Sequence, residues 1–254
     1  MGSSKNLVRA LAYAGISLLA GASAALADGE PSIKDAAPEG RQFTYAITIG
    51  GTSDYVFRGF SQSDENPAFQ AAVDIGYGIF YAGAWGSGID FEFGGSAEVD
   101  LYAGIKPVLG PVTFDAGVIY YSYPDQGGPL NVDYVELKLG ASVTPITNLS
   151  LGVTGYWSPE YTFETGEVWT VEGYAGYTLP QFGIFTPTIS GLYGYEEGEE
   201  DFEAFNGFDS YSYWNAGLAL AVEKFTFDFR YWDTDVDSGL ADERFVFSFK
   251  VVLP

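Results

Sequence analysis

Carboxylates are the side chains with which this 254-residue chain could do chemistry, because it has 34 Asp and Glu but no His and no Cys. Without imidazole or thiol there is no Ser-His-Asp triad, no thiolate nucleophile, no Cys or His zinc site and no axial His for haem. Carboxylate pairs are plentiful, but no spacing selects one acid and one base in a shared cleft, as glycosidase chemistry requires. We therefore expect no enzyme and no cofactor.

Two acidic stretches invite a metal hypothesis. Asp233, Asp235 and Asp237 have the alternate spacing of a calcium loop. However, Ser238 stands where the EF-hand needs Gly, and Arg244 stands where it needs a bidentate Glu. The other stretch predicts a solvated loop, with weak divalent-cation bridging to lipopolysaccharide as the alternative: Glu196, Glu197, Glu199, Glu200, Asp201 and Glu203. We predict no metal site from either stretch.

The net charge narrows the choice of partners. The formal charge is −23 at pH 7. Nucleic acid is not expected as a partner, because neutralising phosphates needs a surplus of Lys and Arg. Cations, or a surface that carries cations, fit this charge better.

The N-terminus has the layout of a secretory signal peptide over residues 1–27. Lys5 and Arg9 form the positive region, residues 10–26 are apolar or small, and Ala25-Leu26-Ala27 is an Ala-x-Ala cleavage site. A retained transmembrane anchor is the alternative. Residues 28–41 are rich in polar residues, Pro and Gly, and predict a flexible N-terminal segment.

From residue 42 to residue 254 the sequence alternates between apolar and polar or small residues, with the period of β-strands. About twelve such segments follow one another, each near the roughly 9 to 11 residues that a tilted strand needs to cross a bilayer. Short links alternate with longer, more acidic ones, which is typical of outer-membrane barrels. The sequence predicts an all-β fold, a transmembrane antiparallel up-and-down β-barrel. A secreted soluble β-sandwich is the alternative.

In such a barrel the apolar face of each strand contacts lipid and the polar face lines the lumen. The predicted pore-lining residues are Asp54, Arg58, Asp74, Asp90, Glu98, Asp100, Asp115, Glu136, Lys138, Glu172, Asp228 and Arg230. Aromatic residues near the strand ends predict a girdle at the membrane interface: Tyr55, Phe57, Trp85, Tyr123, Trp157, Trp169, Tyr195, Trp214 and Tyr231. This assignment extends the first strand through Phe57 and turns Tyr81 and Trp85 towards lipid.

Arg58 has two interpretations at this stage. It is either a charge at a pore constriction or an ion-pair partner that stiffens the wall beside Asp54 or a carboxylate on a neighbouring strand. Opposite charges two residues apart on one strand face, Glu136/Lys138 and Asp228/Arg230, would similarly brace the wall. Because carboxylates outnumber cations on the lumen face, we expect a net-negative interior.

Several runs resemble the TorF family of porins, outer-membrane proteins of Gram-negative bacteria. Residues 53–62, SDYVFRGFSQ, followed by NPAFQ at 66–70, are similar to the opening motif of that family. Residues 81–87, 98–104 and 121–124 are similar to its Y-x-G-x-W-x-S, E-x-D-x-Y-x-G and Y-x-Y-P motifs. The resemblance implies a β-barrel porin, without a substrate. The chain departs from many outer-membrane barrels by ending on Pro254 rather than on an aromatic residue.

The sequence therefore predicts an integral protein of the bacterial outer membrane, a porin-like channel for passive passage of small solutes or ions that prefers cations. A non-conducting receptor or structural barrel is the alternative. The expected partners are outer-membrane lipid and lipopolysaccharide, small solutes or cations, and the barrel-assembly and periplasmic chaperone machinery during biogenesis.

Overall fold

The computed structural model describes residues 43–91, 94–124, 126 and 131–254. The predicted signal peptide (1–27) and the N-terminal segment (28–41) lie outside the described residues.

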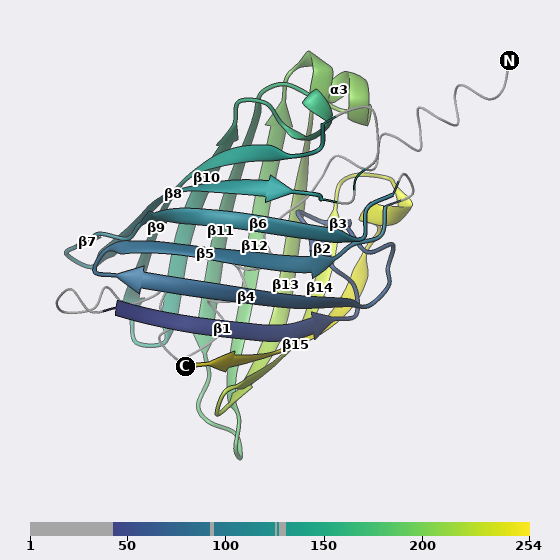
Figure 1. Ribbon diagram of the computed structural model, residues 1–254. Coiled ribbons are helices and arrows are strands. Elements are labelled where there is room, and N and C mark those ends of the chain that lie inside the picture. The colour runs from purple at the N-terminus through teal and green to yellow at the C-terminus, as the bar shows by residue number, and fades with distance from the viewer. Residues whose placement is uncertain (1–42, 92–93, 125, 127–130) are drawn as a thin grey trace, which may run out of the picture.

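Twelve long strands of the described chain form one closed antiparallel barrel (Figure 1). Each strand pairs with its neighbours in chain order. The first and last strands also pair, with Ile47 opposite Leu253 and Thr52 opposite Ser248. Closure leaves no unpaired sheet edge, as a lipid environment requires. The strands are β1 (Phe43–Thr52), β4 (Ala68–Tyr77), β5 (Phe80–Gly88), β6 (Ala97–Ile105), β8 (Val112–Ser122), β9 (Tyr134–Ile146), β10 (Leu149–Ser158), β11 (Val168–Thr178), β12 (Thr186–Gly198), β13 (Ser210–Val222), β14 (Phe225–Thr234) and β15 (Arg244–Leu253).

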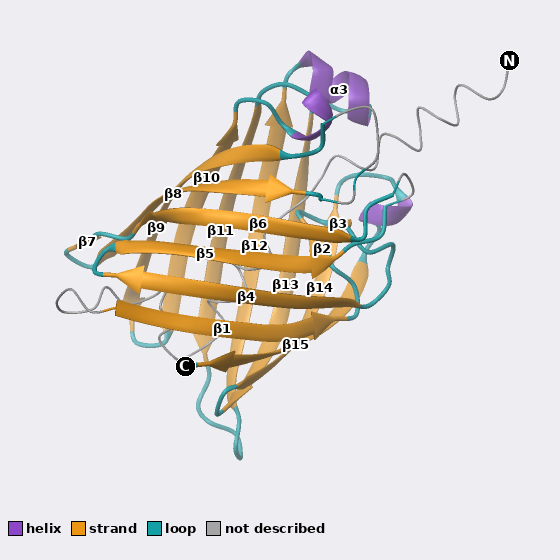
Figure 2. Cartoon of the chain, in the orientation of Figure 1, coloured by secondary structure: helices purple, strands orange, loops and turns teal. Residues whose placement is uncertain are grey.

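The two ends of the barrel differ in the length of their connections. At the turn end, residues 78–79, 147–148 and 223–224 each join two strands directly, and Gly78 and Asn148 take the left-handed backbone conformation that tight hairpins need. At the loop end, the connections are longer and hold the helices, drawn in purple in Figure 2. None of the helices among the described residues is long and apolar enough to cross a membrane. The short elements are β2 (Val56–Phe57), β3 (Phe60–Ser61), β7 (Val108–Leu109), η2 (Thr162–Glu164), α3 (Glu200–Asn206) and η3 (Gly239–Ala241).

Side chains alternate across the barrel wall much as the sequence predicts. On β6, Val99 and Leu101 are exposed on the outside, whereas Glu98 and Asp100 are buried inside. This arrangement is the inverse of a soluble barrel and is typical of barrels whose outer face contacts lipid.

Strand β5 corrects the predicted faces. Trp85 lies opposite Asp100 in the register and is buried, and the Tyr81 hydroxyl donates to Asp115 inside the barrel. Phe80 is exposed on the outer face instead. The prediction was wrong because it assumed that the large side chains of this strand contact lipid and the small ones face the lumen. A Cβ built on Gly104 would lie 2.5 Å from the Tyr81 hydroxyl oxygen, so glycine makes the space that this interior ring occupies.

Candidate constriction site

Residues 54–63, which we call the inward loop, fold into the barrel rather than continuing β1. All ten residues are buried. The loop contains the β2–β3 hairpin, in which Val56 pairs with Ser61 and the Gln62 N–H donates to the Tyr55 carbonyl over 2.7 Å. In Figure 1 this hairpin lies between the strands at the front and those at the back of the barrel. The inward loop therefore occupies the bore near the loop end.

The tip of the inward loop depends on a glycine. Arg58 and Gly59 both have positive φ, of 44° and 89°. A Cβ on Gly59 would lie 2.1 Å from Cγ2 of Thr234 and 3.1 Å from Cβ of Tyr213, which belong to β14 and β13. Backbone conformation and close approach to β13 and β14 thus both favour glycine here.

Arg58 joins the inward loop to two strands of the wall. Its Nη1 lies 2.9 Å from Oε1 of Glu136 on β9 and 2.8 Å from Oε2 of Glu196 on β12, and all three side chains are at most 1% exposed. Its Nη2 donates to Oε2 of Glu136 over 3.0 Å. The guanidinium also lies over the rings of Phe57 and Tyr156. This ion-pair triad crosses the bore.

The charge of Arg58 is maintained by its partners. Burial alone would lower the pKa of the guanidinium, but Glu136, and next Glu196, hold its pKa well above its ordinary value. Arg58 is therefore a fixed cation at any ordinary pH.

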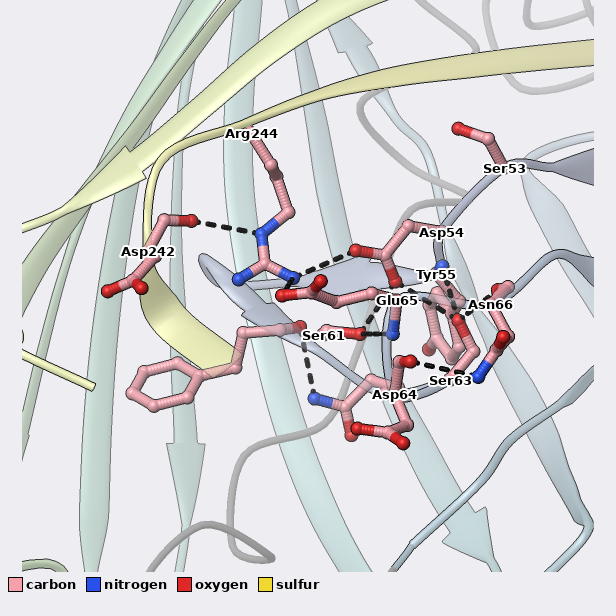
Figure 3. A network of polar contacts seen from close by, with 12 residues as sticks. Ser53, Asp54, Tyr55, Ser61, Ser63, Asp64, Glu65, Asn66, Asp242 and Arg244 are labelled. Carbon is pink, nitrogen blue, oxygen red and sulfur yellow. Dashed lines mark hydrogen bonds and ion pairs between the residues drawn. The ribbon is translucent and has the colours of Figure 1, made fainter. Parts of the chain in front are cut away.

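Asp54 anchors the base of the inward loop to the wall (Figure 3). It accepts hydrogen bonds from the hydroxyls of Ser61 (2.6 Å) and Ser63 (3.0 Å). Its other oxygen accepts from Nη1 of Arg244 on β15 over 2.9 Å. Arg244 also lies 3.5 Å from Glu65, which is exposed. The loop is thus fixed at its base and at its tip by separate ion pairs.

Tyrosine hydroxyls donate to two carboxylates near the inward loop. The buried Glu136 accepts from Tyr121 (2.8 Å), and the partly exposed Glu172 accepts from Tyr213 (2.8 Å). Aromatic rings pack beside Tyr121, since its ring centroid lies 4.4 Å from that of Tyr134, which in turn lies 4.6 Å from that of Tyr161. Hydrogen bonds from hydroxyls are what allow a carboxylate to stay charged in such surroundings.

Between the inward loop and the turn end of the barrel, charges are paired but remain in contact with solvent. Asp115 lies 2.8 Å from Lys138 and 3.6 Å from Lys106, and these side chains are 12–21% exposed. Asp228 and Arg230 pair over 2.9 Å and are 15% and 11% exposed. We call these two groups the mid-barrel ion pairs.

Most of the predicted pore-lining residues lie on strands with their side chains turned inward. These are Asp74, Glu98, Asp100, Asp115, Glu136, Lys138, Glu172, Asp228 and Arg230.

Three of the predicted pore-lining positions need correction. Asp54 and Arg58 belong to the inward loop rather than to a wall strand, because β1 ends at Thr52. Asp90 is exposed in the link after β5, where its backbone N–H donates to the Gln62 carbonyl.

The predicted pairing of charges is also partly wrong. Asp228 does pair with Arg230, but Lys138 pairs with Asp115 on β8 rather than with Glu136. Arg58 pairs with Glu136 and Glu196 and not with Asp54. These partners depend on the register between strands, which cannot be read from the spacing of residues along one strand.

The predicted girdle separates into two groups. Five aromatic residues are on the outer face, where Trp157 lies 5.8 Å from Trp169 and Trp214 lies 5.4 Å from Tyr231: Trp157, Trp169, Tyr195, Trp214 and Tyr231. For the other four residues the predicted position is wrong. Tyr55, Phe57, Trp85 and Tyr123 are inside the barrel and at most 9% exposed. They fill space beside the inward loop, whose position the sequence did not indicate.

Sequence reasoning missed Glu196 as a site residue. It was assigned to the solvated acidic loop, but it lies on β12 and is completely buried. A signal was present, since Glu196 continues the alternation of the inward-facing Thr188, Ser190 and Gly194.

Comparison with known proteins places the chain in a family. A family model described as "Bacterial protein of unknown function (Gcw_chp)" matches residues 35–251. The chain belongs to the Gcw_chp family. No curated protein matches its sequence.

Solved structures show the same fold for this Gcw_chp protein. The KdgM porin is 11% identical with a TM-score of 0.56, over 81% of this chain and 98% of that chain. The NanC porin is 12% identical with a TM-score of 0.54, over 82% and 98%. The COG4313 outer membrane channel from Pseudomonas putida F1 is 10% identical with a TM-score of 0.50, over 89% and 99%. KdgM is also known in complex with disordered oligogalacturonate. The fold is therefore that of porin-like outer-membrane barrels.

Proposed function

We propose that this protein is an integral outer-membrane channel of porin type, which passes small solutes or ions through a bore constricted by the inward loop and prefers cations. The observation that carries this proposal is the position of Arg58, which crosses the bore between Glu136 and Glu196. A loop folded into a lumen sets the narrowest point of any passage through it. The resemblance of residues 53–62 to the TorF porins supports the same assignment.

The size of the barrel supports a narrow passage. Eight-stranded barrels are filled by their own side chains, whereas barrels of 16 to 18 strands leave a wide aqueous channel. Twelve strands lie between these cases. The solvent-contacting mid-barrel ion pairs indicate that water enters from the turn end.

The charges that face the interior support a preference for cations. The carboxylates are Asp54, Asp74, Glu98, Asp100, Asp115, Glu136, Glu172, Glu196 and Asp228, and the cations are Arg58, Lys106, Lys138, Arg230, Arg244 and Lys250. This surplus of negative charge would repel polyanions such as the oligogalacturonate in the KdgM complex.

The alternative is a non-conducting receptor or structural barrel. The burial of residues 54–63 favours it, because a solute can pass that level of the bore only if the inward loop moves. The two functions differ in whether the inward loop leaves the bore.

Conductance across planar bilayers tests the channel. Thr52 pairs with Ala68, so replacing residues 53–67 by Asn-Gly would join β1 and β4 through a two-residue hairpin. We expect small, intermittent currents from the full chain and larger, steady currents from this shortened variant. Asp64→Asn is the matched control, since Asp64 is exposed at the outer part of the same connection. No current from either the full chain or the shortened variant would leave the non-conducting barrel.

The reversal potential in a tenfold KCl gradient tests selectivity. We expect the sign of a cation-selective pore, weakened in a double variant, Asp74→Asn with Glu172→Gln, because both carboxylates face the interior. Glu197→Gln, which removes a charge from the outer face of β12, should leave the potential unchanged. An anion-selective sign would contradict the proposal.

The remaining parts of the proposal concern biogenesis and surroundings. The exposed apolar outer face fits contact with outer-membrane lipid and lipopolysaccharide, and insertion of such a barrel needs periplasmic chaperones and the barrel-assembly machinery. Recovery in the outer-membrane fraction, with heat-modifiable mobility on gels, tests this placement.

A further inference from the structure

One pair of interior carboxylates differs from all the others that the structure describes. Glu98 and Asp100 face inward on β6 with no measurable exposure. Glu98 accepts one hydrogen bond, from the Tyr123 hydroxyl to its Oε1 over 2.9 Å. Its Oε2, and both Oδ1 and Oδ2 of Asp100, are buried without a hydrogen-bond partner.

The contrast with neighbouring acids is clear. Asp115 and Asp228 have Lys or Arg partners, Glu136 and Glu196 share Arg58, and Glu172 accepts from two tyrosines. A buried carboxylate without a donor or a counter-charge costs several kcal/mol in effective terms, so such a group needs an explanation such as a bound ion.

Among the residues that the structure describes, those packed around Asp100 supply no positive charge. Trp85 on β5 and Tyr121 on β8 are its register partners, and Glu136 on β9 adds a further negative charge nearby. From the inward loop, the Tyr55 hydroxyl faces both carboxylates. Burial raises the pKa of Tyr55, and Glu98 and Asp100 raise it further, so this phenol stays neutral. Three carboxylate oxygens and the Tyr55 hydroxyl are thus buried beside the inward loop, and none of the four has a hydrogen-bond partner within reach.

We propose that Glu98 and Asp100 form a binding site for a hard divalent cation of the calcium class, held between β6 and the inward loop. Calcium takes oxygen ligands from carboxylates, hydroxyls and water, and its charge matches that of two carboxylates. No group of three or more Asp, Glu, His or Cys in the described ranges is placed to hold a metal ion. The site therefore has two carboxylate residues, and other oxygens complete the coordination. This site is independent of whether the barrel conducts.

Terbium luminescence tests the site directly, because Tb³⁺ substitutes for Ca²⁺ and emits when a nearby tryptophan is excited. Excitation at the long-wavelength edge of tryptophan absorption, where tyrosine does not absorb, keeps Tyr55, Tyr121 and Tyr123 from contributing. Trp85 lies opposite Asp100 on the neighbouring strand, where paired side chains are about 5 Å apart at Cβ. We expect sensitised emission from the folded, detergent-solubilised full chain, displaced by Ca²⁺. The double variant Glu98→Gln with Asp100→Asn should lose this emission, with at least about a tenfold fall in affinity.

Two variants separate this site from the acidic external loops. Trp85→Phe should lose the sensitised emission yet still bind Ca²⁺ in calorimetry. Asp74→Asn, which removes an interior carboxylate that accepts from Tyr102, should keep both signals. Emission that survives in the double variant, or in Trp85→Phe, would overturn the assignment.

Thermal unfolding gives a second test, in which the double variant and the wild type should differ in opposite directions without and with Ca²⁺. In a chelator the double variant should unfold at a higher temperature than the wild type, because it lacks the unpaired charges. Added Ca²⁺ should raise the midpoint of the wild type only, since a ligand that binds the folded state stabilises it. Absence of both emission and calcium dependence in the wild type would overturn the proposal and show that the pair carries a proton instead.

Discussion

The inward-loop region and the mid-barrel ion pairs use the same residue types on the same alternating strands, yet their environments differ. Around the inward loop, Glu136 and Glu196 are at most 1% exposed and share one arginine. At mid-barrel, Asp115 is 21% exposed and has two lysines. The charges beside the inward loop are shielded from solvent and held by one arginine, whereas the mid-barrel charges are paired but still reached by solvent. We call the first region the dry region. The difference arises because Arg58 and its neighbours in the inward loop pack over Glu136 and Glu196, whereas solvent still reaches the mid-barrel ion pairs.

The largest expected effect is the loss of the central cation. Arg58→Ala should destabilise the barrel by about 3 to 5 kcal/mol, because it leaves two buried carboxylates without their counter-charge. Arg230→Ala should cost clearly less, because solvent reaches Asp228 and screens it. Urea unfolding in detergent measures both. Equal costs would remove the distinction between the two regions.

Substitution on β5 tests which residues belong to the dry region. Ala84→Arg places a charge on the outer face and should cost about 2 to 4 kcal/mol if the residue lies near the membrane midplane. Trp85→Phe should fold, because it keeps an apolar ring inside. Folding yield into lipid vesicles measures the difference. The reverse order would restore the face assignment made from the sequence.

Single hydroxyls should matter more in the dry region than at mid-barrel. Tyr121→Phe removes a donor from the buried Glu136 and should cost about 1 to 3 kcal/mol. Tyr81→Phe removes a donor from Asp115, which keeps two lysines, so its cost should be smaller. Thermal unfolding midpoints compare the two variants, and a larger effect for Tyr81→Phe would argue against exclusion of water by the loop.

The smallest effect is expected on the outside of the same strand. Glu197→Gln should change stability by no more than about 0.5 kcal/mol, as for an exposed surface residue. Its neighbour Glu196→Gln should cost far more, because Glu196 binds Arg58 and Thr170. Urea unfolding of these two variants compares the same substitution at a buried and an exposed position, so that a difference in cost reports burial and not residue type. A costly Glu197→Gln would show that the loop end is packed on its outer face too.

The sequence by itself determined the barrel: its twelve strands, its short and long connections, and the outward side of strands such as β6. Those features are local, because alternation with period 2 and the residues of tight turns act within one segment. For Arg58 it left two roles open, a charge at a pore constriction and an ion-pair partner. It did not indicate the partners of Arg58, the inward direction of Trp85 and Tyr123, or the burial of Glu196.

Only the tertiary structure decided those points, and the physical reason is the same for each. The residues 54–63 continue the alternating pattern well enough to resemble strand, but Gly59 and its contacts with Thr234 and Tyr213 turn them into the bore. Once a loop fills the lumen, aromatic side chains are as well placed inside as against lipid. The surroundings of each carboxylate then depend on the register across strands that are distant in sequence. That register decides whether a carboxylate contacts solvent, pairs with a cation or has no partner.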